Sequence, residues 1–379
     1  MKVAFLSSDW GDYVSSQPGG CTWIRCFGPS EQLNKLGLDT VIGEVGWRDD
    51  EGFVAVPTVE RLKTNSRGPI INPKEYSGGI DVVIFKLWMW HEAKEYFEKA
   101  QKLGQTIIFD VDDWFDGLPT TNIAFQTTHP DRDATWNRNH MLASYRYCDG
   151  LITSTKFLND FYSKKNENCY QVYNSIDPKH FVKRWDSAGV KPTVGWVGIM
   201  VWRSGDIEEL QGWLGPFLDR HDLRFHHAGI NPQDPKEFAR IAKIDPERLT
   251  GTTGSSAQYY GNLLLPMDIG IVPLNSLPFN EAKSNLKGLE YAMSGIPFVA
   301  YGSYEYKKLE SEGAGNTATK ARHWINHMEK LIDPSYRKEQ ADRGYELVSD
   351  KYNIVNVAPL WLETIEKIVK NNKRSRLNK

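Results

Sequence analysis

The chain has 379 residues, of which 40% are hydrophobic and 25% are charged, and its formal net charge is -2. This composition excludes a disordered or fibrous protein, and the near-neutral balance gives no general affinity for polyanions. A single hydrophobic core seldom grows beyond about 250 to 300 residues, so we expect two domains of ordinary size.

The four cysteines lie far apart, with neither the paired spacing nor the neighbouring histidines of a zinc site. We therefore expect no disulfide framework and no metal. No run of the sequence approaches the roughly 18 apolar residues of a membrane span, and the N-terminal apolar run is too short for a signal peptide. These features favour a soluble, cytoplasmic protein.

The first half alternates short apolar strands with helical segments. Strands rich in Val and Ile, without polar alternation, are typical of a parallel sheet that is buried on both faces. Alternation with helices predicts βαβ units. The expected strands are KVAFL (2–6), TVIGEV (40–45), DVVIF (81–85), TIIFDV (106–111), GLITS (150–154) and YQVYN (170–174), and the expected helices span 22–37, 91–103, 134–147 and 156–162.

A second series of the same kind follows a polar stretch rich in Gly and Pro. The expected strands are TVGWVG (193–198), LRFHHAG (223–229), RLTGTTG (248–254), DIGIVPL (268–274) and PFVAY (297–301), with helices at 207–214, 257–264 and 278–293. The fold class is therefore α/β, with two tandem Rossmann-like parallel-sheet domains facing a cleft. We expect an N-terminal domain at 1–180, a linker at 181–191, a C-terminal domain at 192–355, and a final helix with a basic tail, 356–379, that crosses back to the N-terminal domain.

The loop after the first strand, SSDWGDYVSSQPGG (7–20), ends with Gly19 and Gly20 directly before a helix that carries Arg25. Glycines allow close approach of the backbone to an anion, and a helix start offers free N–H groups to a phosphate. The alternative is a plain flexible loop, since the stretch contains neither a GxGxxG nor a P-loop motif.

Four acids, Asp110, Asp112, Asp113 and Asp116, follow one another at the end of a buried strand, beside Trp114. Crowded carboxylates raise one another's pKa unless a cation, a donor network or a reaction uses them. Three interpretations stay open. The acids chelate a metal as an Asp-x-Asp pair, or Asp112 or Asp113 binds or deprotonates a hydroxyl, or Asp113 caps a helix.

The second half repeats the arrangement of strand, glycine-containing loop and helix start in VGWVGIMVWRSGDIEEL (194–210). Arg203 and Ser204 lie where a diphosphate would meet the helix dipole. The alternative is an exposed arginine opposite Glu208.

Charged residues also mark the segment PFNEAKSNLKGLEYAMSGIPFVA (278–300). On one helix, Lys283 and Lys287 would share a face, with Glu290 close to it one turn on. Lys283 and Ser284 are placed to bind phosphates and Glu290 to accept from ribose hydroxyls. Surface pairing of Lys287 with Glu290 is the alternative.

Three stretches carry a resemblance to the GT-B glycosyltransferases, specifically the retaining family 4 group with its bacterial and phage members. VYNSIDPKHF (172–181) resembles the family's Asn-Gly-x-Asp linker signature, with Asn174 and Asp177 at matching positions and Ser175 in place of the glycine. DIGIVPLNSLPFNEAKSNLKGLEYAMSGIPFVAY (268–301) resembles the donor-site segment, in which the carboxylate at the Glu290 position binds the donor ribose. PGGCTWIR resembles the family's glycine loop.

Besides Ser175, the sequence departs from the family pattern at two further places. The first glutamate of the family's Glu-x7-Glu motif falls on Ala282, so the donor-sugar contact must come from Glu281, Asn280 or elsewhere. DVDDW stands where many members carry a histidine of the catalytic site.

The resemblance implies transfer of a sugar from a nucleoside diphosphate, UDP or GDP, to an acceptor hydroxyl with retention of configuration and without a metal. Gly19, Gly20, Arg203, Ser204, Lys283, Ser284, Lys287 and Glu290 would bind the donor. Asp112 or Asp113 would orient or deprotonate the acceptor hydroxyl.

The acceptor is less defined. Trp88, Trp90 and Trp114 are candidates to stack on it, although most aromatics pack in cores. A glycan or lipid-linked envelope precursor is preferred. Two basic runs, 61–74 and 367–379, keep open a phage-type enzyme that modifies hydroxymethylated pyrimidines in DNA, in the host cytoplasm. A non-catalytic nucleotide-sugar-binding module is a further alternative, and the oligomeric state stays open.

Overall fold

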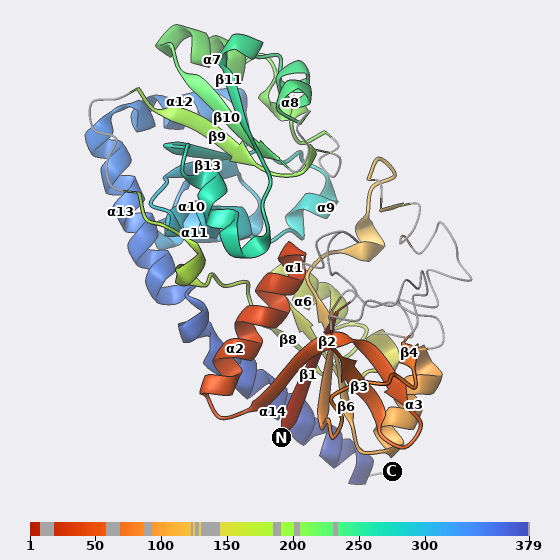
Figure 1. The fold of residues 1–379 in the computed structure, drawn as a ribbon. Coiled ribbons are helices and arrows are strands. Elements are labelled where there is room, and N and C mark those ends of the chain that lie inside the picture. Colours follow the sequence, from red (N-terminus) through yellow and green to blue (C-terminus); the bar gives the residue numbers. More distant parts are fainter. Residues whose placement is uncertain are drawn as a thin grey trace. The chain divides into compact units, whose positions relative to one another are not determined.

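The computed structural model describes residues 1–7, 19–57, 69–86, 93–122, 124–125, 129, 145–184, 191–200, 205–229 and 234–377. The chain divides into two compact units (Figure 1). Unit 1 comprises Met1–Leu118, Ala124–Asn174 and Ile354–Lys379, and unit 2 comprises Pro119–Ile123 and Ser175–Asn353. The C-terminal segment therefore belongs to the N-terminal unit.

Unit 1 is built on an eight-stranded sheet with the order β3-β2-β1-β5-β6-β7-β8, in which β4 pairs with β2. Its strands are β1 (Lys2–Ser7), β2 (Asp39–Arg48), β3 (Gly52–Val56), β4 (Ile70–Ile71), β5 (Val82–Lys86), β6 (Thr106–Val111), β7 (Gly150–Thr153) and β8 (Cys169–Gln171). The pairings are parallel except that of β2 with β3, which was not expected from the sequence. A tight turn ending at Gly52, with φ +82°, joins these two strands.

Helices cover both faces of this sheet, which is why its strands are apolar on both sides. The helices are α1 (Gly20–Thr22), a π-helix (Trp23–Phe27), α2 (Gly28–Lys35), α3 (Ala93–Lys102), α6 (Lys156–Tyr162) and α14 (Ile354–Leu377). On one face Phe5 packs against Trp361 of α14, with 6.0 Å between the ring centroids. On the other, Phe85 stacks on Phe97 of α3 at 5.5 Å. The core thus holds the strand ends in fixed positions.

Unit 2 contains a six-stranded sheet with the order β11-β10-β9-β12-β13-β14, and every pairing in it is parallel. Its strands are β9 (Thr193–Val197), β10 (Arg224–Gly229), β11 (Leu249–Thr253), β12 (Ile269–Val272), β13 (Phe298–Tyr301) and β14 (Asn316–Ala318). Its helices are α7 (Leu214–His221), α8 (Asp234–Ala242), α9 (Pro278–Glu281), α10 (Leu286–Met293), α11 (Tyr304–Glu312), α12 (Ala321–Ile332) and α13 (Pro334–Lys351). The expected class of two Rossmann-like parallel-sheet domains is confirmed.

Several expected helices differ from those observed. The helix expected at 207–214 is a 3-10 turn, Glu208–Leu210, and α7 begins only at Leu214, because Gly212 with φ +79° interrupts the segment. The segment Ala257–Leu264 is a 3-10 helix. The helix expected at 134–147 lies almost wholly outside the described residues. In the part of the chain that the structure describes, no helix is both long and apolar enough to cross a bilayer.

Candidate functional site

In unit 1, the glycine loop connects the end of β1 to the start of α1. Gly19 is the residue before the helix, and its carbonyl accepts a hydrogen bond from the Trp23 amide at 2.9 Å. The Ser7 and Thr22 hydroxyls lie 2.6 Å apart and join β1 to α1. A Cβ atom on Gly20 would meet nothing within 4 Å, so packing inside the protein does not require a glycine there. Residues 8–18 of the loop lie outside the described residues.

Arg25 forms a buried ion pair with Asp110 at the end of β6. The two side chains are 2% and 1% exposed, and the guanidinium donates from Nε and Nη2 to the two carboxylate oxygens at 3.0 and 2.6 Å. Nη1 donates to the Val172 carbonyl at 2.7 Å and to Asn174 Oδ1 at 3.2 Å. The guanidinium also lies over the Trp361 ring. Arg25 therefore joins the helical segment after the glycine loop to β6, to the residues that follow β8 and to α14.

Asp112 forms a second ion pair, with Lys86 at the end of β5, and the Lys86 side chain is completely buried. Burial alone would raise the pKa of Asp112, but the charge and hydrogen bond of Lys86, with smaller effects of Arg25 and Cys21, together lower that pKa below its ordinary value of 3.8. The prediction that crowded acids raise one another's pKa excepted acids that meet a cation, and Asp112 is such an acid. Metal chelation by Asp110 and Asp112 would have to displace both cations.

Asp113 and Trp114 form the turn that follows. Asp113 Oδ1 accepts from the Trp114 amide at 3.0 Å, and the 3-10 helix Phe115–Gly117 has no side-chain cap, so the capping alternative for Asp113 is not observed. Trp114 is half-buried, and its ring meets the edges of Phe157 and Phe161 of α6, with centroids 4.9 and 5.5 Å apart. Trp114 thus belongs to an aromatic cluster on α6.

The last acid of the group, Asp116, contacts α6 and the residues after it. Its Oδ1 accepts from Lys165 Nζ at 2.6 Å, and its Oδ2 accepts from the Tyr162 hydroxyl at 3.2 Å. Three of the four acids therefore face a lysine or an arginine. Among the described residues, no group of three or more His, Cys, Asp or Glu side chains gathers to hold a metal ion.

In unit 2, Asp206 organises the loops that follow β9 and β12. Its Oδ1 accepts from the Asn275 amide and from Asn280 Nδ2, both at 2.9 Å. Gly205, with φ +82°, packs so close to Asn275 that a Cβ atom would lie 2.7 Å from its Nδ2. The predicted phosphate-binding residues Arg203 and Ser204 precede this network and lie outside the described residues.

The helix expected at 278–293 is broken in two. Ala282 to Asn285 separate α9 from α10, so Lys283 and Lys287 do not share one helical face, and that expectation is wrong. Lys283 and Ser284 lie between the helices, half-buried, and Lys283 Nζ sits 4.3 Å from the centroid of the Phe279 ring.

Glu290 is 7% exposed on α10, and its Oε2 accepts a hydrogen bond from the Tyr260 hydroxyl at 2.8 Å. Lys287 Nζ lies 3.4 Å from the same hydroxyl oxygen. The next residue, Tyr291, fixes α10 to the sheet, because its ring packs on Gly270 and its hydroxyl accepts from the Val197 amide. Glu290 is therefore a buried carboxylate in a fixed position and not half of an exposed surface pair.

Glu281 and Asn280 are the two candidates for the contact made by the family glutamate, whose position is occupied here by Ala282. The Ala282 side chain is itself completely buried. The Asn280 side chain is buried and donates to Asp206 and to Asn275. Glu281 is half-buried at the end of α9, and its Oε2 accepts from the Tyr304 amide at 3.3 Å. Glu281 is the better placed of the two to contact a ligand.

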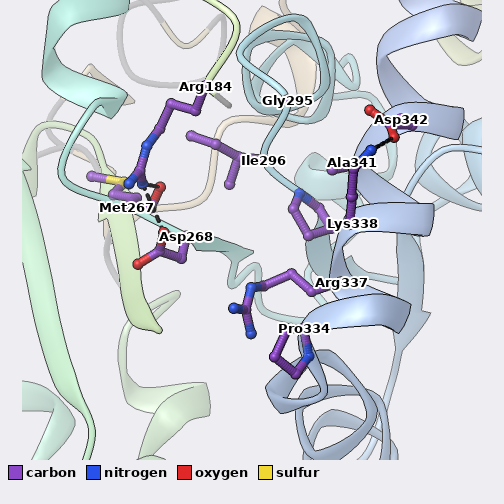
Figure 2. Close-up of a pocket in the computed structure, with 11 residues that line it drawn as sticks. Arg184, Met267, Asp268, Gly295, Ile296, Pro334, Arg337, Lys338, Ala341 and Asp342 are labelled. Carbon is purple, nitrogen blue, oxygen red and sulfur yellow. Dashed lines mark hydrogen bonds and ion pairs between the residues drawn. The ribbon is translucent and has the colours of Figure 1, made fainter. Parts of the chain in front are cut away.

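A pocket lies at the other end of α10 (Figure 2). It carries charges of both signs, including Arg184, whose Nη1 lies 3.0 Å from Asp268 Oδ1, and Arg337, whose Nη1 donates to two carbonyls at the end of α12. The lining residues are Arg184, Met267, Asp268, Gly295, Ile296, Pro297, Pro334, Arg337, Lys338, Ala341 and Asp342. They include none of the site residues predicted from the sequence.

Two further predicted residues, Trp88 and Trp90, lie outside the described residues. The sequence analysis missed Lys86, Asp206 and Tyr260. Lys86 had a usable signal, since it ends an apolar strand whose neighbour carries Asp110 in register with it. Asp206 and Tyr260 had no such signal. The partners of Asp206 are at least 69 residues away in the chain, and Glu290, the partner of Tyr260, is 30 residues away.

No protein-family model matches the sequence, and no curated protein matches it. Solved structures do resemble it. Sucrose-phosphate synthase from Thermosynechococcus elongatus has a TM-score of 0.65 at 14% identity, covering 98% of this chain and 100% of that one. HepE from Anabaena, in complex with UDP, has a TM-score of 0.64 at 13% identity, covering 97% and 100%. A glycosyltransferase from Rickettsia africae has a TM-score of 0.60 at 12% identity, covering 98% of each chain.

These structural neighbours are GT-B glycosyltransferases. At such low identity the likeness shows the fold: two Rossmann-like parallel-sheet domains in the GT-B order.

Proposed function

We propose that the protein is a retaining glycosyltransferase that transfers a sugar from a nucleoside diphosphate, UDP or GDP, to an acceptor hydroxyl without a metal ion. The fold likeness supports the class, and complexes of the neighbour HepE with UDP and with UDP-glucose support the donor. The resemblance of residues 268–301 to the donor segment of the retaining family 4 enzymes supports retention.

Glu290 is the observation that carries this proposal. A buried carboxylate costs free energy unless hydrogen-bond donors satisfy it, and the Tyr260 hydroxyl is one such donor to Glu290. The vicinal hydroxyls of a ribose are two donors at the spacing that a carboxylate accepts. Glu290 then holds the ribose from a helix that Tyr291 fixes to the sheet.

The departing diphosphate gains negative charge in the transition state, and preorganised cations and N–H groups can stabilise it. We assign this task to Lys283, Lys287 and Arg203, with the Ser204 and Ser284 hydroxyls and the backbone of Gly19 and Gly20 as further donors. Glu281 takes the donor-sugar contact of the glutamate that Ala282 replaces. Because these groups supply the positive charge themselves, the proposed reaction is metal-independent.

Asp112 and Asp113 receive different roles at the acceptor hydroxyl. The pKa of Asp112 is lowered by Lys86, so Asp112 is a weak base that stays ionised and orients the hydroxyl. Asp113 faces no lysine in the contacts described above and is our candidate base. Asp113→Asn should lower kcat by about a hundredfold or more, and Asp112→Asn by less. Unaltered activity in both variants would contradict this assignment.

For the acceptor we propose a glycan or a lipid-linked precursor, stacked on Trp114 with Trp88 and Trp90. The near-neutral charge of the chain argues against a DNA acceptor. Hydroxymethylated DNA should be included when acceptors are screened, since the two basic runs favour it.

The test is a thermal-shift titration with UDP, GDP, ADP and CDP, with magnesium and with EDTA. A ligand at about a hundred times its dissociation constant stabilises the native state by about 2.7 kcal/mol. One diphosphate should stabilise the protein equally in magnesium and in EDTA, and Glu290→Gln, if it binds about tenfold more weakly, should reduce the stabilisation to about half.

Glu312 offers a matched control in the same unit. Like Glu290, Glu312 lies beside a tyrosine and a lysine. Its two carboxylate oxygens accept hydrogen bonds from the Tyr352 hydroxyl and from Lys351 Nζ, both at 2.7 Å. Glu312→Gln should keep the nucleotide shift. The proposed function is withdrawn if none of the four diphosphates stabilises the wild-type protein.

A further inference from the structure

Tyr260 joins two elements that are distant in the sequence. It lies in the 3-10 helix Ala257–Leu264, and its hydroxyl donates to Glu290 Oε2 at 2.8 Å on α10. Lys287, one turn before Glu290, approaches the same hydroxyl oxygen at 3.4 Å. A lysine donating to a phenol oxygen polarises the phenol, which strengthens its own donation to a carboxylate. The three side chains therefore form a chain that ends on Glu290.

The position of Tyr260 is set from outside α10. The neighbouring Gly261 packs so tightly that a Cβ atom would lie 2.2 Å from the His180 carbonyl oxygen. His180 Nδ1 lies 3.1 Å from the Gln258 carbonyl, and the Phe181 ring lies 6.4 Å from that of Tyr260. The segment just after the Asn174-to-Asp177 signature thus holds the 3-10 helix in place. The backbone position from which Tyr260 contacts Glu290 is therefore fixed.

We propose that Tyr260 is a positioning residue for ribose recognition. Its hydrogen bond fixes the rotation of the Glu290 carboxylate, which has about four lone-pair positions and so can accept from ribose hydroxyls as well. A site built to hydrogen-bond a hydroxyl rejects ligands that lack it. Tyr260 would therefore set the preference for ribonucleotide over deoxyribonucleotide donors. This inference rests on the proposed function and adds the residue that gives Glu290 its selectivity.

The test compares dissociation constants, measured by calorimetry, for UDP, GDP, ADP and CDP and for their 2′-deoxy and 3′-deoxy counterparts. The wild-type protein should bind its ribonucleotide about tenfold more tightly than either deoxy form, as expected for a hydrogen bond to a charged group. Tyr260→Phe should weaken the ribonucleotide several-fold and leave the deoxy forms within about twofold, so the ratio falls toward one. Glu290→Gln should remove the preference.

Two controls separate positioning from general stability. Tyr352→Phe removes the equivalent phenol beside Glu312 and should leave the ratio unchanged. The double variant Tyr260→Phe with Glu290→Gln should lose no more selectivity than Glu290→Gln alone, because both changes act through one carboxylate.

Each other outcome overturns the inference in a recognisable way. Equal weakening of ribo and deoxy forms by Tyr260→Phe would make Tyr260 merely structural. An unchanged ratio, or a wild-type protein without ribose preference, would overturn the inference while the proposed function stands. A wild-type protein that binds none of the diphosphates would overturn both together.

Discussion

The two units of the molecule satisfy their buried carboxylates in different ways. In unit 1, Asp110 and Asp112 each meet a buried cation, Arg25 and Lys86, at the ends of adjacent strands. In unit 2, Glu290 accepts from the neutral phenol of Tyr260. An ion pair neutralises a carboxylate directly, whereas Tyr260 is a hydrogen-bond donor whose own oxygen lies 3.4 Å from Lys287 Nζ.

We expect this difference to separate carboxylates that maintain the fold from a carboxylate that binds a ligand. Removing a cation in unit 1 should leave an uncompensated buried charge, and the loss should be seen in stability. Removing the phenol in unit 2 should change the orientation of Glu290, and the loss should be seen in affinity. Substitutions of these residues and their partners distinguish the two cases.

Arg25→Met should have the largest effect on stability. The change leaves Asp110, which is 1% exposed, without its bidentate partner, and it also removes the contacts to Val172, Asn174 and Trp361. We expect a loss of about 3 to 5 kcal/mol in the free energy of unfolding, measured by urea denaturation.

The double variant Arg25→Met with Asp110→Asn is the control. It removes both charges, so it should recover at least half of the loss. A loss below about 1 kcal/mol in Arg25→Met would mean that Asp110 is not the buried charge it is taken to be, and the contrast between the units would fail.

Lys86→Met should reverse the pH dependence that Asp112 contributes. In the wild-type protein the pKa of Asp112 is lowered from 3.8, so its contribution to stability is present above that pH and is lost as the pH falls. Without Lys86, burial is opposed only by the smaller effects of Arg25 and Cys21, so the pKa of Asp112 should rise and ionised Asp112 should become destabilising as the pH rises. The gap in the free energy of unfolding between the two proteins should widen from about pH 3 to pH 6, to about 3 kcal/mol.

Adding Asp112→Asn to Lys86→Met removes the titrating group and should flatten this gap. Lys86→Arg, which keeps the positive charge, should retain most of the wild-type profile. A gap in Lys86→Met that does not change with pH would show that Lys86 stabilises the fold by packing and not through Asp112.

Much of the fold was predictable because buried parallel strands are marked by continuous apolar runs. The sequence analysis failed where tertiary contacts decide local structure. The break between α9 and α10 has no glycine or proline to signal it, and Asn280 within α9 is held by Asp206 from a distant loop. The strand β3 was missed because its short apolar run, 53–56, forms an antiparallel hairpin in an otherwise parallel series.

The candidate site was predictable to a smaller extent. Glu290 was found because its segment resembles a donor site, and the acids of β6 because four of them are close together. Their partners were not found, since a hydrogen bond between Tyr260 and Glu290 leaves no pattern in the sequence. Which acid meets which cation depends on the order of the strands in the sheet, and that order comes from the structure.

Gly261→Ala should weaken nucleotide binding through Tyr260. The added Cβ atom would lie 2.2 Å from the His180 carbonyl oxygen, so the 3-10 helix must shift, and Tyr260 shifts with it. We expect about tenfold weaker binding of the nucleoside diphosphate by calorimetry and a loss of about 1 to 3 kcal/mol in stability. Gly344→Ala, on α13 in the same unit, makes only ordinary contacts and should bind normally. Unimpaired binding by Gly261→Ala would show that Tyr260 does not depend on this anchor.

Glu312→Gln should have the smallest effect and defines what is particular to Glu290. Burial alone would raise the pKa of Glu312, but its hydrogen bonds from Lys351 and Tyr352 lower it below 4.5. Its contribution to stability is therefore present above that pH and is lost in acid. We expect a loss of about 1 kcal/mol or less in the free energy of unfolding at neutral pH, and a nucleotide affinity within about twofold of wild type. If Glu312→Gln impaired nucleotide binding as much as Glu290→Gln, the loss would reflect a general weakening of unit 2. Glu290 would then be one more fold-maintaining carboxylate, like those of unit 1.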